Sequence, residues 1–194
     1  GGSIKYSEDD ILATERGDDP YNHSYLNWAN EVYKPTYITQ HTLNLTGGSE
    51  VGRYLVSFDY LDQPGLVKNT EYQRYSYRVN TDLNIGKMLK VSSDVTYRHV
   101  DRLWPESLGS VQYDVWSMQP TSPVRYENGD YRLDKQNRNA ISLMDLDVVG
   151  EDRYNMDVVY GQVKADFEPI KDLVFTGMAS LNGSWDRRKI HYKN

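Results

Sequence analysis

The side chains in this sequence that could catalyse a reaction or bind a ligand are carboxylates and aromatic rings. Asp145, Asp147 and Gly150 imitate the start of a calcium-binding loop. Such a loop also needs oxygen ligands at the positions occupied here by Val149 and Met156. The sequence therefore predicts no calcium site in this stretch.

A second set of carboxylates lies just downstream, at Glu151, Asp152 and Asp157. A pair drawn from them could hydrolyse a glycosidic bond only at a defined separation, which the sequence does not give. The four histidines are isolated and have no metal-type spacing: His23, His41, His99 and His191.

The motifs of metalloproteases, P-loop enzymes, dinucleotide-binding folds and serine hydrolases are also missing from the sequence. The absence of cysteine removes disulfides, zinc–thiolate sites and a cysteine nucleophile together. We therefore expect no catalytic residue, no metal site and no cofactor.

Aromatic residues in a long irregular stretch are the better candidates for binding. They could stack on sugar rings or pack on peptide side chains, and as an alternative they form a local core that holds the stretch in shape. The predicted substrate-binding residues are Trp104, Tyr113, Trp116, Tyr126 and Tyr131. The chain has 17 tyrosines against 3 phenylalanines. Tyrosine suits a membrane–water boundary or a sugar-binding surface, although it is also a good strand former.

The elements that must position these residues are β-strands. Around Tyr77, the odd positions are aromatic or aliphatic and the even positions are charged or amide-bearing. Successive side chains of a strand point to opposite faces, so such a segment has one apolar and one polar face. The same alternation predicts hairpins over residues 38–61, 72–102 and 157–185. The polar face should line a water-filled lumen with Arg78, Asn80, Asp82, Arg98 and Lys164.

The predicted connections differ between the two ends of the strands. Short glycine-containing turns follow the first and third strands, whereas the second is followed by a longer link with a Pro-Gly turn. A long loop over residues 103–156 follows the fourth strand, with short helices expected over residues 108–118 and 140–148. Short turns at one end and long loops at the other are typical of an outer-membrane β-barrel.

Composition limits the remaining choices. Mean hydropathy is −0.75, and no apolar run approaches the ~20 residues of a transmembrane helix. That measure does not exclude a barrel, whose strands need only every second residue to be apolar. The net charge of −6 argues against a nucleic-acid partner.

Residues 1–37 form a predicted linker, irregular or with one short helix over residues 9–15, that leads into a partial β-barrel over residues 38–194. The start lacks a signal peptide and is expected to be a mature terminus or an internal cut. About six strands with one long extracellular loop are too few to close a membrane barrel, for which ~8 is the minimum. We therefore expect an all-β fold that is part of a large antiparallel transmembrane barrel.

Several segments closely resemble the opening barrel strands of the SusC/RagA family of TonB-dependent outer-membrane transporters. The Gly-Gly-Ser-Glu hairpin at residues 47–50, combined with the run at residues 72–80, is the specific part of the match. The other matching segments are residues 25–33, 40–46, 54–69, 89–91 and 167–173. Residues 140–152 match only loosely.

The resemblance implies a 22-stranded barrel preceded by a plug. It further implies import of oligosaccharides or peptides across the outer membrane of a Gram-negative bacterium. The implied partners are a SusD-like lipoprotein lid, the TonB complex acting through a plug segment, outer-membrane lipid, and a glycan or peptide ligand. The alternatives are a soluble β-sandwich that binds glycans and a β-rich glycosidase domain.

Overall fold

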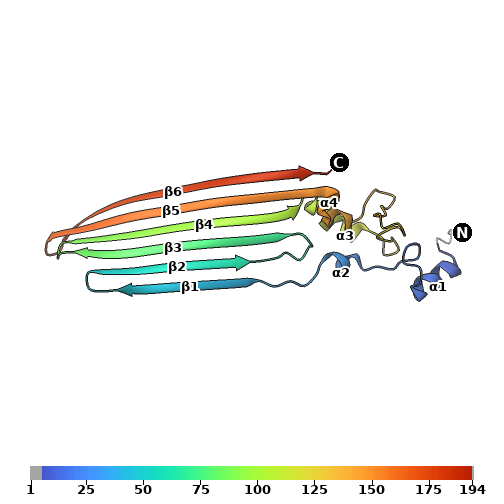
Figure 1. Ribbon diagram of the computed structural model, residues 1–194, viewed down its shortest axis with the longest axis horizontal. Coiled ribbons are helices and arrows are strands. Elements are labelled where there is room, and N and C mark those ends of the chain that lie inside the picture. The colour runs from blue at the N-terminus through green and yellow to red at the C-terminus, as the bar shows by residue number, and fades with distance from the viewer. Residues whose placement is uncertain (1–5, 194) are drawn as a thin grey trace.

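The computed structural model describes residues 6–193. Six strands form one antiparallel sheet, in which each strand pairs with its neighbours in sequence (Figure 1). The strands are β1 (Thr39–Gly48), β2 (Gly52–Asp62), β3 (Glu71–Ile85), β4 (Leu89–Pro105), β5 (Gly150–Ile170) and β6 (Leu173–Tyr192). The helices are α1 (Glu8–Arg16), α2 (Trp28–Val32), α3 (Leu108–Ser117), the 3-10 helix η1 (Ser142–Met144) and α4 (Leu146–Val149). The all-antiparallel sheet confirms the predicted fold class.

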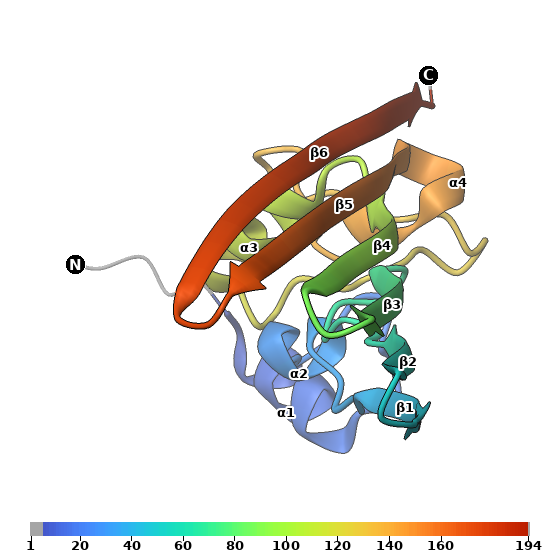
Figure 2. The same cartoon turned by 90° about the vertical axis from the view of Figure 1, so that its left-hand side faces the viewer.

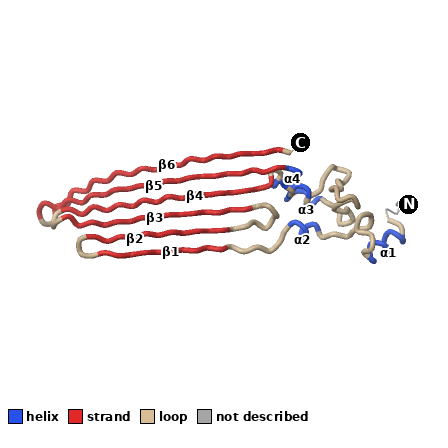
Figure 3. Tube along the Cα trace, in the orientation of Figure 1, coloured by secondary structure: helices blue, strands red, loops and turns tan. Residues whose placement is uncertain are grey.

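The connections are sorted between the two ends of the sheet (Figure 3). Three tight turns join β1 to β2, β3 to β4 and β5 to β6, and Gly86 and Asp172 adopt left-handed conformations in two of them. The longer connections, residues 63–70 and 106–149, lie at the opposite end together with the helices. We call these two ends the turn end and the loop end. Seen along the strands, the sheet is twisted and curved (Figure 2).

The last two strands are longer than the alternation predicts. The hairpin expected over residues 157–185 extends over Gly150–Tyr192, and the loop expected over residues 103–156 shrinks to residues 106–149. The pairing continues because backbone hydrogen bonds do not depend on side-chain polarity. The alternation stops earlier because both faces of β6 carry charged residues near the loop end, as Arg187 on one face and Arg188 on the other illustrate.

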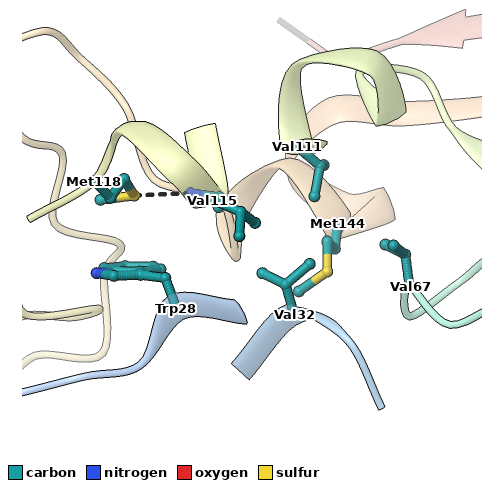
Figure 4. Packing of buried hydrophobic residues seen from close by; sticks show 8 residues of the cluster. Trp28, Val32, Val67, Val111, Val115, Met118 and Met144 are labelled. Atoms are coloured by element: carbon teal, nitrogen blue, oxygen red, sulfur yellow. Dashed lines mark hydrogen bonds between the residues drawn. The ribbon is translucent and has the colours of Figure 1, made fainter. Parts of the chain in front are cut away.

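A small apolar core lies at the loop end, between segments that are far apart in sequence (Figure 4). We call residues 24–37, 63–70 and 106–149 the cap. Its buried core consists of Trp28, Val32, Val67, Val111, Val115, Met118, Ala140 and Met144. Trp28 donates a hydrogen bond from Nε1 to the Gln119 carbonyl oxygen over 3.0 Å, and Asn69 Nδ2 donates to the Met144 carbonyl oxygen over 2.8 Å. The first contact ties the segment before β1 to the long loop, and the second ties the link between β2 and β3 to the same loop.

The helices follow from local sequence. Ser7 and Asp10 form a reciprocal capping box at the start of α1, and Gly17 ends the helix in a left-handed conformation. For the start of the chain, the sequence predicts either an irregular linker or one short helix over residues 9–15, and the short helix is the correct alternative. The predicted division at residue 38 remains a prediction, and residues 1–5 of the predicted linker lie outside the described residues. Among residues 6–193, no helix combines the length and apolar character needed to cross a membrane.

Candidate functional site

One side of the sheet, which we call the apolar face, carries aliphatic and aromatic side chains with little covering them. The register places Leu45, Val56, Val79 and Val95 in one row across β1 to β4. These residues are 39–58% exposed, and Leu181 of β6 reaches 70%. A soluble monomer rarely exposes an apolar patch of this extent, so the face is built to meet an apolar environment.

Aromatic rings form two rows across this face near the loop end. His41, Tyr60, Tyr75 and His99 make the first row, with ring centroids 6.4, 5.0 and 6.3 Å apart. The second row runs through Phe58, Tyr77 and Tyr97 at 5.1 and 6.1 Å. Together with Trp185, which is paired with Asp157 at the end of the first row, we call these residues the aromatic belt. Amphipathic rings in a band of this kind are typical of a membrane–water boundary.

Two polar groups of the belt share one partner on the protein. The Tyr97 hydroxyl donates to Asp157 Oδ1 over 2.6 Å, and His99 Nδ1 lies 2.8 Å from the same oxygen. Near the turn end, Phe167 and Phe175 are paired across β5 and β6 on the same face. The apolar face is thus bounded by aromatic rings near both ends.

The opposite side of the sheet, the polar face, carries a network of charges and hydrogen bonds. Asp59 accepts hydrogen bonds from Gln40, Thr42 and Arg74 over 2.7, 2.9 and 3.0 Å. Lys164 and Thr176 both donate to Asp166, over 2.8 and 2.7 Å. The contacts of Asp59 and the Thr176–Asp166 hydrogen bond cross between strands and hold the sheet together on its polar face.

The residues predicted to face a lumen all lie on the polar face. Asn80 is opposite Asp94, and Asp82 and Lys164 flank Ser92 on either side. Arg78 and Arg98 follow the same register, and within residues 6–193 neither side chain forms a hydrogen bond or an ion pair. The structure therefore groups the five residues, and their role in lining a pore stays a prediction.

A cluster that the sequence did not reveal closes the polar face at the loop end. Asp152 is 6% exposed and accepts hydrogen bonds from Arg188 over 2.9 and 2.8 Å. Arg102 lies 3.5 Å from the same carboxylate, and its guanidinium stacks on Trp104 at 3.8 Å and on Tyr154 at 5.0 Å. Only one sign of this cluster can be read from the sequence: Arg102 and Trp104 are two residues apart on one strand and therefore share a face.

No family model matches the chain. Two curated proteins of Formosa agariphila are similar to it: TonB-dependent receptor P26, 30% identical over 114 residues, and TonB-dependent receptor P3, 30% identical over 99 residues. These matches cover 58% and 48% of this chain but only 11% and 10% of the relatives. The chain therefore spans about a tenth of the length of these relatives.

Solved structures agree in fold. A structure described as the RagAB peptide transporter superimposes with a TM-score of 0.73 at 21% identity, over 97% of this chain and 24% of that chain. The RagAB peptide importer in its closed-closed and open-open states gives TM-scores of 0.69 and 0.68, at 18% and 20% identity. These two cover 97% and 96% of this chain, and 24% and 23% of theirs. The chain has the fold of a SusC/RagA-type barrel segment.

The carboxylates considered for catalysis do not form a catalytic pair. Asp152 is on the polar face and Asp157 on the apolar face, because their positions along β5 differ by an odd number. Glu151 and Asp157 share a face but lie six residues apart, about 20 Å along the strand. Asp145 accepts hydrogen bonds from the Tyr131 hydroxyl and the Asp147 amide, so its role is local. Within residues 6–193, no group of three metal-binding side chains comes together.

The five aromatic residues predicted to bind substrate are separated by the fold. Trp104 is at the end of β4, under Arg102. Tyr126 and Tyr131 are on a small turn of the cap, where the guanidiniums of Arg132 and Arg125 lie 5.5 and 3.7 Å from their ring centroids.

Tyr113 and Trp116 are the pair that the structure brings together. They lie three residues apart on α3 and therefore share one side of the helix. Both are open to solvent, 69% and 76% exposed. Val111 and Val115 on the same helix are buried in the cap core.

Proposed function

We propose that this chain is part of the barrel of a TonB-dependent importer in the outer membrane of a Gram-negative bacterium. The observation that carries the proposal is the pairing of an exposed apolar face, bounded by aromatic rings, with a polar face on the same strands. Such a sheet fits lipid on one side and a water-filled lumen on the other. The names of the similar proteins, TonB-dependent receptors and RagAB importers, support this proposal.

The height of the apolar face supports membrane insertion. On β3 it runs from Ile85 at the turn end to Tyr75 in the aromatic belt, ten residues along one strand. At ~3.3 Å per residue and a strand tilt of ~40°, this distance corresponds to about 25 Å along the membrane normal. That is the height of the apolar band of an outer-membrane barrel.

The proposed cargo is an oligosaccharide or a peptide, and the proposed partners are a SusD-like surface lipoprotein, acting as a lid, and the TonB complex. The RagAB structures are described as a peptide importer and transporter, which supports the peptide alternative and a two-component assembly. The exposed pair Tyr113 and Trp116 provides stacking surfaces that either cargo could use.

The soluble alternatives fit less well. A β-sandwich covers its apolar face with a second sheet, whereas all strands within residues 6–193 belong to one sheet. We infer that the protein is not an enzyme, because the similar proteins carry the names of receptors and importers. The carboxylates proposed for glycoside hydrolysis are also on different faces or far apart.

The full-length protein should be tested for membrane insertion and for transport. We expect a folded barrel in the outer-membrane fraction, recognised by a mobility shift on heating before electrophoresis. Cells should take up labelled oligosaccharides or peptides only when TonB is intact. A protein that remains soluble without detergent, or uptake that is unchanged in a strain lacking TonB, would contradict the proposal.

A further inference from the structure

Basic side chains gather on one part of the apolar side of the sheet, just beyond the aromatic belt. Arg187 and Lys189 of β6 and Arg153 of β5 point to the same face as Trp185, two and four residues further toward the loop end. Arg153 is directly opposite Lys189 in the register. At ~5 Å between paired residues and ~6.6 Å between alternate residues of a strand, the three cations are close enough to surround one small anion.

These cations are available for a ligand. Arg187, Lys189 and Arg153 are all exposed. Within residues 6–193, the side chains of Arg187 and Lys189 form no hydrogen bond and no ion pair. Asp157, which is opposite Trp185 on the same face, is close enough to Arg187 to interact with it electrostatically. Arg153 forms one long contact, 3.7 Å to Glu151, which also lies 3.8 Å from His191. The neighbouring Arg188 points to the other face, where Asp152 occupies it.

The positive charge is local to β5 and β6. The row that contains Arg187 continues through Asn155, Asp101, Gln73 and Asp62, so its other charged members are acidic. The whole chain carries a net charge of −6. A basic cluster at this single place therefore does not follow from the overall composition.

The cluster is continuous with the belt. The Trp185 ring lies over Gly183, where a Cβ atom would come within 3.0 Å of it, so the indole extends along β6 away from Arg187. An apolar surface is thus joined directly to a group of cations. This arrangement matches an amphiphile with acyl chains on one side and an anionic head on the other.

We propose that the outer surface of β5 and β6 binds a lipid with a phosphate-bearing headgroup. Arg153, Arg187 and Lys189 surround the phosphate, and Trp185 packs against the upper part of the acyl chains. This proposal rests on the proposed function, because it requires the apolar face to meet lipid. It adds a binding site for one class of lipid to that function.

The test uses the full-length protein in detergent, with diphosphorylated lipid A and the same lipid after removal of its phosphates as probes. Native mass spectrometry measures the apparent affinity for each lipid. Arg187→Gln combined with Lys189→Gln should weaken binding of the phosphorylated lipid about thirtyfold, since each of the two cations near the surface contributes about 1 kcal/mol. Binding of the dephosphorylated lipid should not change.

Lys87→Gln combined with Lys171→Gln is the matched control. It removes the same charge from two of the three turns at the opposite end of the sheet and should leave both affinities unchanged. Equal loss in the control and the test variant, or an unchanged preference for the phosphorylated lipid in the test variant, would overturn the proposal. In parallel, the amount of folded barrel in the membrane fraction is measured by its mobility shift on heating before electrophoresis. Failure of the unaltered protein in that measurement contradicts the proposed function itself, whereas normal insertion without lipid preference contradicts only the lipid site.

Discussion

Asn139 organises the interior of the cap from an almost fully buried position, 1% exposed. Its Nδ2 donates to the carbonyl oxygens of Val124 and Arg132 over 2.8 and 2.9 Å. Its Oδ1 accepts from the amides of Ile141 and Ser142 over 3.0 and 3.2 Å. One side chain therefore fixes two loop segments and the entry to η1.

Asn139→Ala should destabilise the cap by about 2–4 kcal/mol, because four backbone groups lose their partner and most of them are shielded from water. Protease susceptibility of residues 106–149 in the full-length protein, followed over temperature, measures the effect. Asn128→Ala serves as the control, since Asn128 is exposed and bonds only to Asp130 on its own turn. Equal protease resistance of both variants would show that Asn139 does not hold the cap together.

His23 links α1 to the following turn through two carboxylates. Its Nε2 lies 3.2 Å from Asp10 Oδ1, and its Nδ1 lies 3.2 Å from Asp19 Oδ2. The hydrogen bond with Asp10, followed by that with Asp19, raises the pKa of the imidazole above its usual value. The same contacts contribute to lowering the pKa of both carboxyl groups, after the larger effects of Ser7 on Asp10 and of Asn22 on Asp19.

This arrangement predicts a pH dependence with a definite sign. Because the folded pKa of His23 is raised, its stabilisation of α1 is fully present below about pH 6.5 and is lost as pH rises through the higher folded value. Amide hydrogen exchange of α1, corrected for the intrinsic rate, should show more protection at pH 5.5 than at pH 8.5. His23→Gln should remove this difference. A difference that persists in the variant would assign the pH dependence to another group.

At the scale of elements, side-chain alternation predicts the strands well wherever the two faces meet different environments. It locates β3, for example, because Tyr77 and Val79 alternate with Arg78 and Asn80. It fails beyond the aromatic belt, where both faces are polar while the backbone pairing continues. The ends of β5 and β6 were therefore not predictable from polarity.

The two faces should respond differently to the same added charge. Val79→Arg places a cation near the middle of the apolar face, which should cost about 2–4 kcal/mol in a membrane and reduce the amount of folded barrel. Asn80→Arg is the control on the next residue of β3. Its side chain lies on the polar face opposite Asp94, and the Asn80 Oδ1 that it removes has no hydrogen-bond partner. The heat-modifiable fraction in membranes measures both, and similar loss in both variants would argue against a lipid-facing Val79.

For the whole molecule, the arrangement of the cap lies beyond what the sequence predicts. The short helix over residues 108–118 could be predicted from its apolar spacing, and α3 is found there. Its partners could not, because Trp28, Val67 and Met144 join it from segments far apart in the chain. The fold of the cap also decides which aromatic residues pack against the protein itself and which remain open to solvent. Trp104 and Tyr131 contact arginines of the protein itself, whereas Tyr113 and Trp116 remain open.

The exposed aromatic side chains of α3, Tyr113 and Trp116, form the surface that should contact cargo in an importer. Tyr113→Ala and Trp116→Ala should each weaken binding of an imported oligosaccharide or peptide by about 1–2 kcal/mol, because each removes an exposed aromatic surface. Neither change should affect folding, since the cap core uses the opposite side of α3. Titration calorimetry on the detergent-solubilised full-length protein measures the affinity. Tyr25→Ala is the control, since Tyr25 is 76% exposed but does not belong to α3. Unchanged affinity in both α3 variants, or an equal loss in the control, would direct the search for the binding surface to the polar face of the sheet instead.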